Sequence, residues 1–294
     1  MSDNHLLEKH GFKMQKKYGQ NFLKDVRIPS RIAENCTDLE LSEGKKAKSL
    51  ILEIGPGAGI LTKELAKRFE KVLAVEIDTE LIPILSESLC DFNNITVINK
   101  DIMEVELSTL LAEYRGEGEE KLPVSVCANL PYYITTPILM KLLEEYSEFS
   151  FITVMVQKEV ARRLCAKPKT EDYGSITAVI GLYGTASKLF DVSAGNFNPK
   201  PNVDSAVAKI SLYNPPKYTK EQIKKTSKVI KAAFSMRRKT LVNTLMSLGA
   251  EGYDTKDDLS QLTESMFGNK NVRGEELSTE QFVALAERLF PDKE

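Results

Sequence analysis

The stretch that decides the fold reads Leu50-Ile51-Leu52-Glu53-Ile54-Gly55-Pro56-Gly57-Ala58-Gly59. Its first five residues include four apolar ones and predict a short buried strand that ends at Gly55. Residues 60–69 follow with apolar side chains at helical spacing. Glycines between a strand and a helix permit a tight turn and let a ligand approach the backbone closely. We therefore predict a strand, a ligand-binding turn and a helix over residues 50–69.

Outward from this unit, apolar strands alternate with helices as far as residue 157. We predict strands at 72–75, 95–98, 124–128 and 151–157, helices at 79–89 and 135–145, and a Gly- and Glu-rich loop at 112–122. This alternation predicts an α/β fold whose mostly parallel sheet is covered on both faces. Such sheets bind ligands at the carboxyl ends of their strands. Four successive strand ends carry candidate ligand residues, namely Gly55, Glu76, Asp101 and Asn129.

The pattern changes beyond residue 157. We predict helices at 159–165 and 175–183 and strands at 186–192 and 205–212. Asn214-Pro215-Pro216 then breaks the chain, and only helical patterns follow, at 219–234, 237–248, 256–267 and 279–290. We therefore predict two domains, residues 1–213 and residues 214–294.

The composition describes a globular protein, because 42% of the 294 residues are apolar and 28% are charged. No apolar run of about 18 residues occurs and the start has no apolar signal segment, so we expect a cytoplasmic protein without membrane insertion. The four cysteines form no CxxC pair, which excludes zinc ribbons and redox dithiols. Both histidines, His5 and His10, fall in an expected tail, so we expect catalysis without histidine and no metal site.

The net charge of −2 conceals a basic block. Residues 211–250 hold nine Lys or Arg and one acid, which is the electrostatic pattern of a nucleic-acid contact. A solvated helix face is the alternative, and we prefer it for any single lysine of 217–231. The basic residues that we assign to RNA binding are Lys17, Arg162, Arg163, Arg237, Arg238 and Lys239.

The glycine turn departs from the dinucleotide pattern G-x-G-x-x-G, because Ile60 stands at its sixth position. The sequence E-x-G-x-G-x-G resembles instead the first motif of S-adenosylmethionine-dependent methyltransferases. Glu76 is placed to accept hydrogen bonds from the two ribose hydroxyls, and Asp101 could contact the adenine ring. The alternatives are an ordinary turn for the glycines, a solvated strand end for Glu76 and a helix N-cap for Asp101.

Asn129-Leu130-Pro131-Tyr132 follows the fourth strand and faces the same edge as the glycine turn. Amino-methyltransferases that act on nucleobases use an N/D-P-P-Y/F-like tetrad, and leucine at the second position is typical of the ribosomal RNA adenine branch. The Asn129 side-chain oxygen and the Leu130 carbonyl would accept hydrogen bonds from the adenine amine and free its lone pair for attack. Tyr132 could stack on the extruded base. The alternative is a rigid turn at Pro131 with a half-buried tyrosine.

The whole chain resembles the bacterial ribosomal RNA small-subunit adenine dimethyltransferases, the kasugamycin-sensitivity family. The shared motifs occur in the expected order and comprise Tyr18 to Leu23, Glu53 to Gly59, Asn129 to Tyr132, Gln157 to Ala161, Tyr173-Gly174, Phe197 through Val203 to Val207, and Phe234 to Leu241. The resemblance implies a Rossmann-like S-adenosylmethionine-dependent methyltransferase fold with a mostly parallel seven-stranded sheet. It also implies a catalytic domain over 1–213 and a helical, RNA-contacting domain over 214–294.

The resemblance implies S-adenosylmethionine as cofactor, with contacts from Asn21, Leu23, Gly55, Gly57, Glu76, Asp101 and Asn129. The implied reaction is dimethylation of the N6 amine of two adjacent adenosines in the 3′-terminal hairpin loop of 16S rRNA. The implied partner is the immature small ribosomal subunit, at a late assembly checkpoint, and we expect a monomer. Phe197 resembles a second aromatic of the target pocket, opposite Tyr132; the alternative is a loop residue packed under Pro199 and Pro201.

Three other functions remain open from the sequence. A resistance methyltransferase would modify one adenosine of the large-subunit RNA, whereas the helical tail and Val203 to Val207 favour the small subunit. A non-enzymatic assembly factor would not need the complete set of glycine-turn, acidic and Asn129 to Tyr132 residues. A nicotinamide dehydrogenase disagrees with the glycine spacing and with the absence of histidine beyond residue 10.

Overall fold

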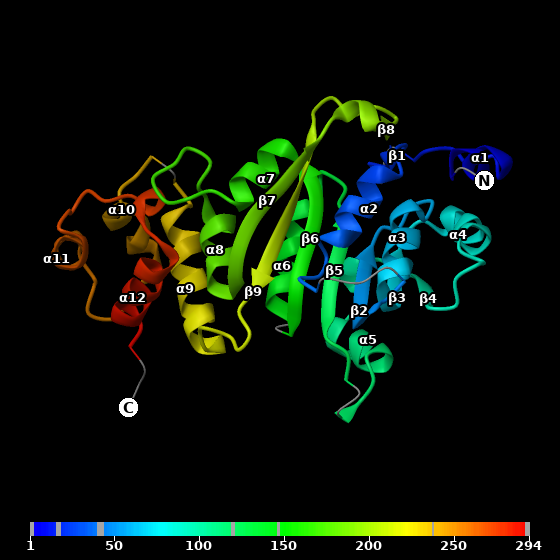
Figure 1. The fold of residues 1–294 in the computed structure, drawn as a ribbon. Coiled ribbons are helices and arrows are strands. Elements are labelled where there is room, and N and C mark those ends of the chain that lie inside the picture. Colours follow the sequence, from blue (N-terminus) through cyan, green and yellow to red (C-terminus); the bar gives the residue numbers. More distant parts are fainter. Residues whose placement is uncertain are drawn as a thin grey trace. The chain divides into compact units, whose positions relative to one another are not determined.

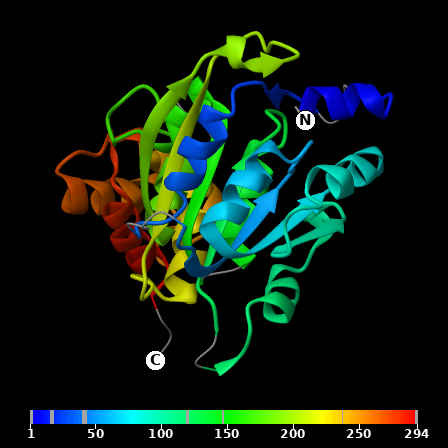
Figure 2. The ribbon, with the colours of Figure 1, turned by 45° about the vertical axis from the view of Figure 1, so that its right-hand side comes forward.

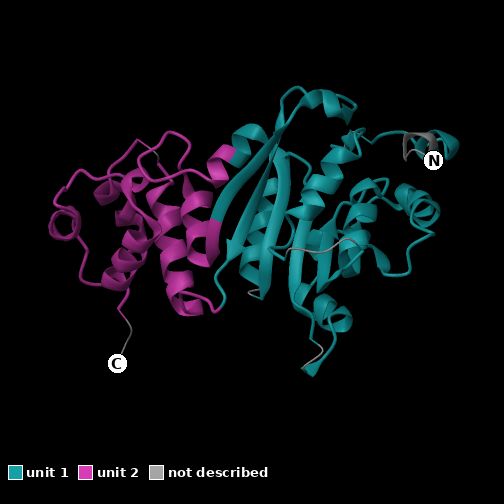
Figure 3. Cartoon of the chain, in the orientation of Figure 1, with its two compact units in different colours: residues 1–161, 186–214 teal, residues 162–185, 215–294 magenta. Residues whose placement is uncertain are grey.

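The computed structural model describes residues 3–15, 19–39, 44–118, 121–145, 148–236 and 238–291. The chain forms two compact units (Figure 3). Unit 1 comprises residues 1–161 and 186–214, and unit 2 comprises residues 162–185 and 215–294.

Unit 1 is built on a seven-stranded sheet (Figure 1). In chain order its strands are β2 (Ala47–Ile54), β3 (Phe69–Glu76), β4 (Ile95–Asn99), β5 (Val124–Asn129), β6 (Phe149–Gln157), β7 (Gly184–Val192) and β9 (Ser205–Leu212). The spatial order is β4-β3-β2-β5-β6-β9-β7. Strands β4, β3, β2, β5 and β6 run parallel, and β9 runs antiparallel to β6. The predicted α/β fold with a mostly parallel sheet is confirmed.

A hydrophobic core fixes helices α2 (Arg27–Glu34) and α3 (Ile60–Arg68) on one face of this sheet. Ile51 of β2 and Phe69 of β3 pack there against Ile32 and Leu65 of the two helices, and all four side chains are at most 1% exposed. Each fully buried side chain of this size contributes about 2 kcal/mol. This packing therefore fixes the position of β2 relative to α3, and with it the turn that joins them.

The remaining helices of unit 1 are α1 (Asp3–Lys9), α4 (Ile82–Ser88), α5 (Leu107–Tyr114) and α6 (Thr135–Glu145), with 3-10 turns η2 (Thr79–Leu81), η3 (Ile102–Glu104) and η5 (Ala194–Asn196). The expectation of a loop over 112–122 is wrong at its start, because α5 continues to Tyr114. The expectation of an N-terminal tail is also wrong. Helix α1 docks through buried Leu6 and Leu7, which pack in one cluster with Ala58, Leu81 and Ile84; its polar composition concealed this short apolar pair.

Unit 2 contains helices α8 (Ser175–Tyr183), α9 (Lys220–Ala233), α10 (Leu241–Leu245), α11 (Lys256–Phe267) and α12 (Thr279–Leu289), with turns η6 (Met246–Leu248) and η7 (Gly274–Glu276). Helix α7 (Lys158–Leu164) crosses the division between the units. The predicted division at 213/214 nearly coincides with the one at 214/215, but residues 162–185 belong to unit 2. The physical reason is that α8 packs against α9 and α12.

Aromatic contacts fix this packing inside unit 2. The Tyr173 and Phe234 rings lie 6.0 Å apart, and Phe234 lies 6.0 Å from Phe282. The Tyr173 hydroxyl donates to the carbonyl of Leu277. The single helix predicted over 237–248 is a shorter helix, α10, that begins after Thr240 and ends in η6.

Candidate active site

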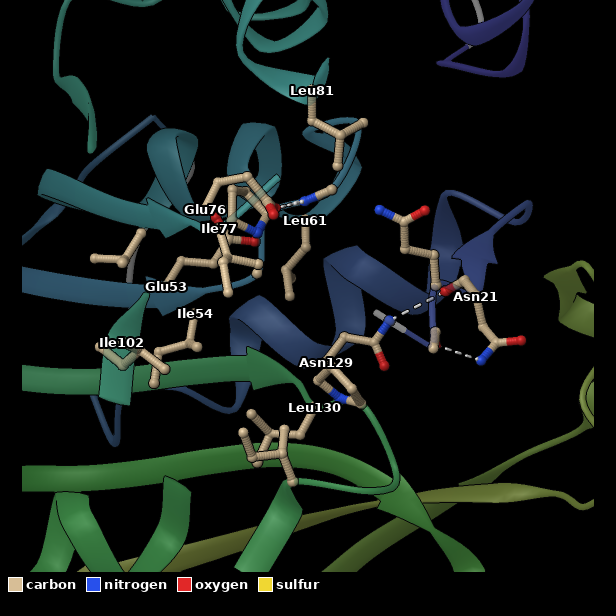
Figure 4. A pocket seen from close by; sticks show the side chains of 18 of the residues that line it. Asn21, Glu53, Ile54, Leu61, Glu76, Ile77, Leu81, Ile102, Asn129 and Leu130 are labelled. Atoms are coloured by element: carbon tan, nitrogen blue, oxygen red, sulfur yellow. Dashed lines mark hydrogen bonds between the residues drawn. The ribbon is translucent and has the colours of Figure 1, made fainter. Parts of the chain in front are cut away.

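A pocket opens in unit 1 at the carboxyl ends of β2, β3, β4 and β5 (Figure 4). Its walls contain every residue that the sequence assigned to the cofactor, together with three residues of the catalytic tetrad beside Asn129. The lining residues named by the sequence analysis are Asn21, Leu23, Gly55, Gly57, Glu76, Asp101, Asn129, Leu130, Pro131 and Tyr132. The structure thus brings the strand-end residues to one cavity, as the parallel sheet predicts.

The glycine turn exposes its backbone to this pocket. Gly55 has a φ of +69°, and a Cβ atom added there would meet nothing within 4 Å. Gly57 has a φ of +61°, and a Cβ atom there would lie 3.1 Å from the Phe22 ring. Both positions therefore favour glycine because their backbone is left-handed. At Gly57 a second reason is that β1 (Phe22–Leu23) passes close by.

Glu76 lies beside the glycine turn in the pocket wall and is only 5% exposed. Its carboxylate accepts hydrogen bonds from the backbone N–H of Gly57 at 3.1 Å and of Asp78 at 2.9 Å. Burial raises the pKa of Glu76, and the two backbone hydrogen bonds oppose that rise. The carboxylate therefore fixes the glycine turn and presents acceptor oxygens inside the pocket.

Glu53 is a pocket residue that the sequence analysis did not assign to the site. It is 1% exposed, and neither carboxyl oxygen has a hydrogen-bond partner among the described residues. Burial raises its pKa to about 8, and the charge of Glu76 adds to the rise. The signal in the sequence was the acidic residue two positions before Gly55, inside an otherwise apolar strand.

Replacing Glu53 tests this buried carboxyl through the pH dependence of stability. Between the ordinary pKa of 4.5 and the folded value of about 8, the unfolded chain has lost the proton that the folded chain keeps, so wild-type stability falls as pH rises. Glu53→Gln removes this penalty. The stability of the variant relative to wild type should grow by roughly 1 kcal/mol per pH unit across that window. Thermal unfolding of both proteins from pH 5 to pH 8 measures it; a constant difference in Tm would contradict the assignment.

The Asn129-to-Tyr132 tetrad begins at the last residue of β5 and is held from several sides. The Asn129 side-chain amide donates to the carbonyl of Asn21 at 3.4 Å (Figure 4). Among the described residues, none donates to the side-chain oxygen of Asn129, which leaves that oxygen available as an acceptor. The Leu130 N–H donates to the carbonyl of Met155 at 3.1 Å, and the Tyr132 hydroxyl lies 3.0 Å from Oγ of Ser205.

Phe197 does not reach the pocket. It is 1% exposed and packs in the core cluster that contains Leu23. Strand β8 (Phe197–Asn198) pairs antiparallel with β1, and the two lie side by side in Figures 1 and 2. Phe197 is thus not among the residues that line the pocket, and its role as a second aromatic of the target pocket stays a prediction. Through this strand pairing, Phe197 connects the segment after β7 to residues 19–23, which form the N-terminal motif.

The N-terminal motif covers one side of the cavity. The Gln20 side chain donates to the buried Asp78 carboxylate at 2.7 Å, and Asn21 donates to the carbonyl of Gly19 at 3.0 Å. Asp101, a pocket residue that follows β4, caps η3 by accepting a hydrogen bond from the backbone N–H of Met103. Asp101 is thus both the N-cap that the sequence left as an alternative and a pocket residue.

The predicted RNA-binding residues fall into two groups. Lys17 and Arg237 lie outside the described residues. Arg162, Arg163, Arg238 and Lys239 are exposed and belong to unit 2, and Arg162 lies 3.7 Å from Asp172. The loop that follows α7 and the start of α10 both form backbone hydrogen bonds with one segment. Lys169 N donates to the carbonyl of Glu275, and Leu241 N donates to the carbonyl of Val272. Two basic stretches thus flank residues 272–275.

Comparison with known proteins decides the family. A sequence model described as "Ribosomal RNA adenine dimethylase" matches residues 11–289. The chain belongs to the ribosomal RNA adenine dimethylase family. A relative from Streptococcus sanguinis (strain SK36), named "Ribosomal RNA small subunit methyltransferase A", is 44% identical over 97% of this chain and 94% of its own length. A relative of the same name from Bacillus licheniformis is 40% identical over the same shares.

Solved structures agree with this membership. A dimethyladenosine transferase from Plasmodium falciparum has a TM-score of 0.70 at 23% identity, over 91% of this chain and 97% of that one. The 23S rRNA methyltransferase ErmE has a TM-score of 0.65 at 26% identity, over 92% and 99%. This ribosomal RNA adenine dimethylase family member is therefore a methyltransferase, and its fold is the S-adenosylmethionine-dependent methyltransferase fold.

The described part of the chain contains no disulfide, no metal-binding cluster and no membrane-spanning helix. All four cysteines are free thiols, and contact with Cys36 together with burial raises the pKa of Cys127. Within residues that the structure describes, no group of three His, Cys, Asp or Glu could hold a metal ion. Over the same residues, no helix has the length and apolar character of a membrane span.

Proposed function

We propose that this protein dimethylates the N6 amine of two adjacent adenosines in the 3′-terminal hairpin loop of 16S rRNA, with S-adenosylmethionine as methyl donor. The substrate is the assembling small ribosomal subunit in the cytoplasm, where the enzyme acts as a monomer and as a late assembly checkpoint. One observation carries the proposal: the glycine turn, the acidic strand ends and the Asn129 tetrad line a single pocket.

The pocket walls fit S-adenosylmethionine. That cofactor supplies an electrophilic methyl group on a positively charged sulfur. The Glu76 carboxylate suits the ribose hydroxyls, and Asp101 suits the adenine ring. The buried Glu53 carboxyl has unpartnered oxygens and suits a cationic group such as the methionine ammonium. The uncovered backbone at Gly55 leaves room for a ligand at the turn.

The tetrad residues suit attack by an aromatic amine. The lone pair of an adenine amine is delocalised into the ring, which makes the nitrogen a poor nucleophile. Hydrogen bonds from the amine to Oδ1 of Asn129 and to the Leu130 carbonyl favour a pyramidal nitrogen with a localised lone pair. Both acceptors are uncharged and do not titrate, so they act as preorganised polar groups rather than as a base. Pro131 and the Leu130–Met155 hydrogen bond keep them in place.

The names of the relatives favour the small-subunit RNA over the large-subunit RNA. The curated relatives at 40% and 44% identity are named for the small subunit, whereas ErmE, at 26%, is named for 23S rRNA. The exposed basic residues of unit 2 are suited to phosphate contacts, which supply affinity rather than sequence choice.

Transfer of tritiated methyl groups to unmodified small subunits tests the proposal. Nucleoside analysis should yield dimethyladenosine from 16S rRNA at both adjacent positions. Unmodified large subunits serve as the matched substrate and should take up no label. Label only in 23S rRNA would establish the resistance-type reaction instead, and label in neither RNA would refute the enzyme assignment for ribosomal substrates.

Tyr133 supplies a further test at the rim of the pocket. Tyr133 is 62% exposed and packs beside Gly19, where an added Cβ atom would lie 3.6 Å from the tyrosine ring. An exposed aromatic beside the target pocket suits stacking on the neighbouring unpaired base. Tyr133→Ala should raise KM for the small subunit about tenfold, and Tyr133→Phe should retain wild-type KM, because stacking does not need the hydroxyl. Equal KM values for all three proteins would remove Tyr133 from the RNA contact.

A further inference from the structure

The first residue of β9 lies at the end of the sheet where the pocket opens, because β9 runs antiparallel to its neighbour β6. Ser205 pairs in register with Gln157, the last residue of β6. The amino end of β9 therefore stands where the parallel strands have their carboxyl ends. Ser205 is 1% exposed, so its hydroxyl cannot exchange partners with bulk water.

The Ser205 hydroxyl reaches the aromatic residue of the tetrad. Its Oγ lies 3.0 Å from the Tyr132 hydroxyl, although β6 separates β5 from β9 in the sheet. Tyr132 is half-buried and lines the pocket, so the Ser205 contact anchors the hydroxyl of a residue that borders the cavity.

The backbone on the Ser205 side of this contact is also fixed. The carbonyl of Asp204 accepts from Lys158 N at 2.9 Å, and the Asp204 carboxylate accepts from Ala194 N at 2.9 Å. These bonds join the start of β9 to the start of α7 and to η5. The hydroxyl of Ser205 is therefore a rigid anchor rather than a mobile surface group.

We infer that Ser205 is a positioning residue for methyl transfer, which sets the plane of the Tyr132 ring before RNA binds. This inference rests on the proposed function, in which Tyr132 stacks on the extruded adenine. A ring whose orientation is fixed in advance loses less conformational freedom when the base arrives. It also holds the base at the distance and angle that attack on a methyl group requires.

A double-mutant cycle on the full-length enzyme tests the inference, with unmodified small subunits as substrate. Tyr132→Phe removes one hydroxyl of the pair and Ser205→Ala removes the other. Each variant should lower kcat about fivefold, the effect of one neutral hydrogen bond, and the double variant should lose no more than either single variant. KM for S-adenosylmethionine should stay at the wild-type value in all three.

Ser125→Ala is the matched control, because Ser125 is a buried serine of β5, 5% exposed, and should leave kcat unchanged. If Ser205→Ala does not fold, Ser205→Cys takes its place in the same cycle, because its slightly larger thiol fills the site and is a weaker hydrogen-bonding group than the hydroxyl. Losses that multiply in the double variant, or a Ser205 variant with wild-type kcat, would overturn the inference. An inactive wild-type enzyme would instead refute the proposed function.

Discussion

Asn129→Ala should lower kcat for methyl transfer by about a hundredfold to a thousandfold, the usual cost of removing one preorganised polar group from a reacting centre. The side-chain oxygen of Asn129 is the acceptor that the structure leaves available at the end of β5. Without it, the adenine amine keeps its lone pair in the ring. Single-turnover methyl transfer to unmodified small subunits measures the effect directly.

Asn129→Asp separates the acceptor role from a structural role. The aspartate keeps acceptor oxygens but loses the amide that donates to Asn21 at 3.4 Å. If acceptance from the adenine amine matters most, Asn129→Asp should retain more activity than Asn129→Ala. If both variants lose activity equally, the Asn129–Asn21 contact is the important one. Wild-type activity in Asn129→Ala would show that the Asn129 side chain does not activate the adenine amine.

The sequence was most informative where a simple geometric rule applies. Parallel strands end at one edge of a sheet, so Gly55, Glu76, Asp101 and Asn129 could be assigned to one site from strand ends alone. The structure places all four in the same pocket. Short apolar runs and glycines encode these features locally, which is why the α/β fold was predictable.

Features that depend on tertiary packing were not predictable in this way. Ser205 begins a strand, and only the antiparallel direction of β9 brings it to the end of the sheet where the pocket opens. Phe197 carries a family motif, but its pairing with Leu23 buries it. Residues 162–185 precede the proline break in sequence, yet contacts of α8 place them in unit 2. In each case the deciding neighbour is distant in the chain.

Glu76→Ala should weaken S-adenosylmethionine binding about a hundredfold, because each hydrogen bond to a charged group contributes about 1.5–3 kcal/mol. The variant loses the acceptors proposed for the ribose and also leaves the N–H groups of Gly57 and Asp78 without their partner. Titration calorimetry gives the dissociation constant. Asp101→Ala, at the pocket residue that follows β4, is the matched comparison and should weaken binding about tenfold, because Asp101 has only one proposed contact.

The pH dependence of S-adenosylmethionine binding tests whether Glu76 contributes through its negative charge or only through its size and shape. Burial raises the pKa of this carboxyl, so protonation begins at a higher pH than for an exposed glutamate. The protonated form is a poorer acceptor for hydroxyl donors, and affinity for S-adenosylmethionine should therefore fall as pH decreases through the raised pKa. Glu76→Gln keeps the volume but cannot ionise, so its weaker affinity should lack this step. If wild type and Glu76→Gln show parallel pH profiles, the Glu76 carboxylate does not bind the cofactor as an anion, and its role is confined to holding the Gly57 turn.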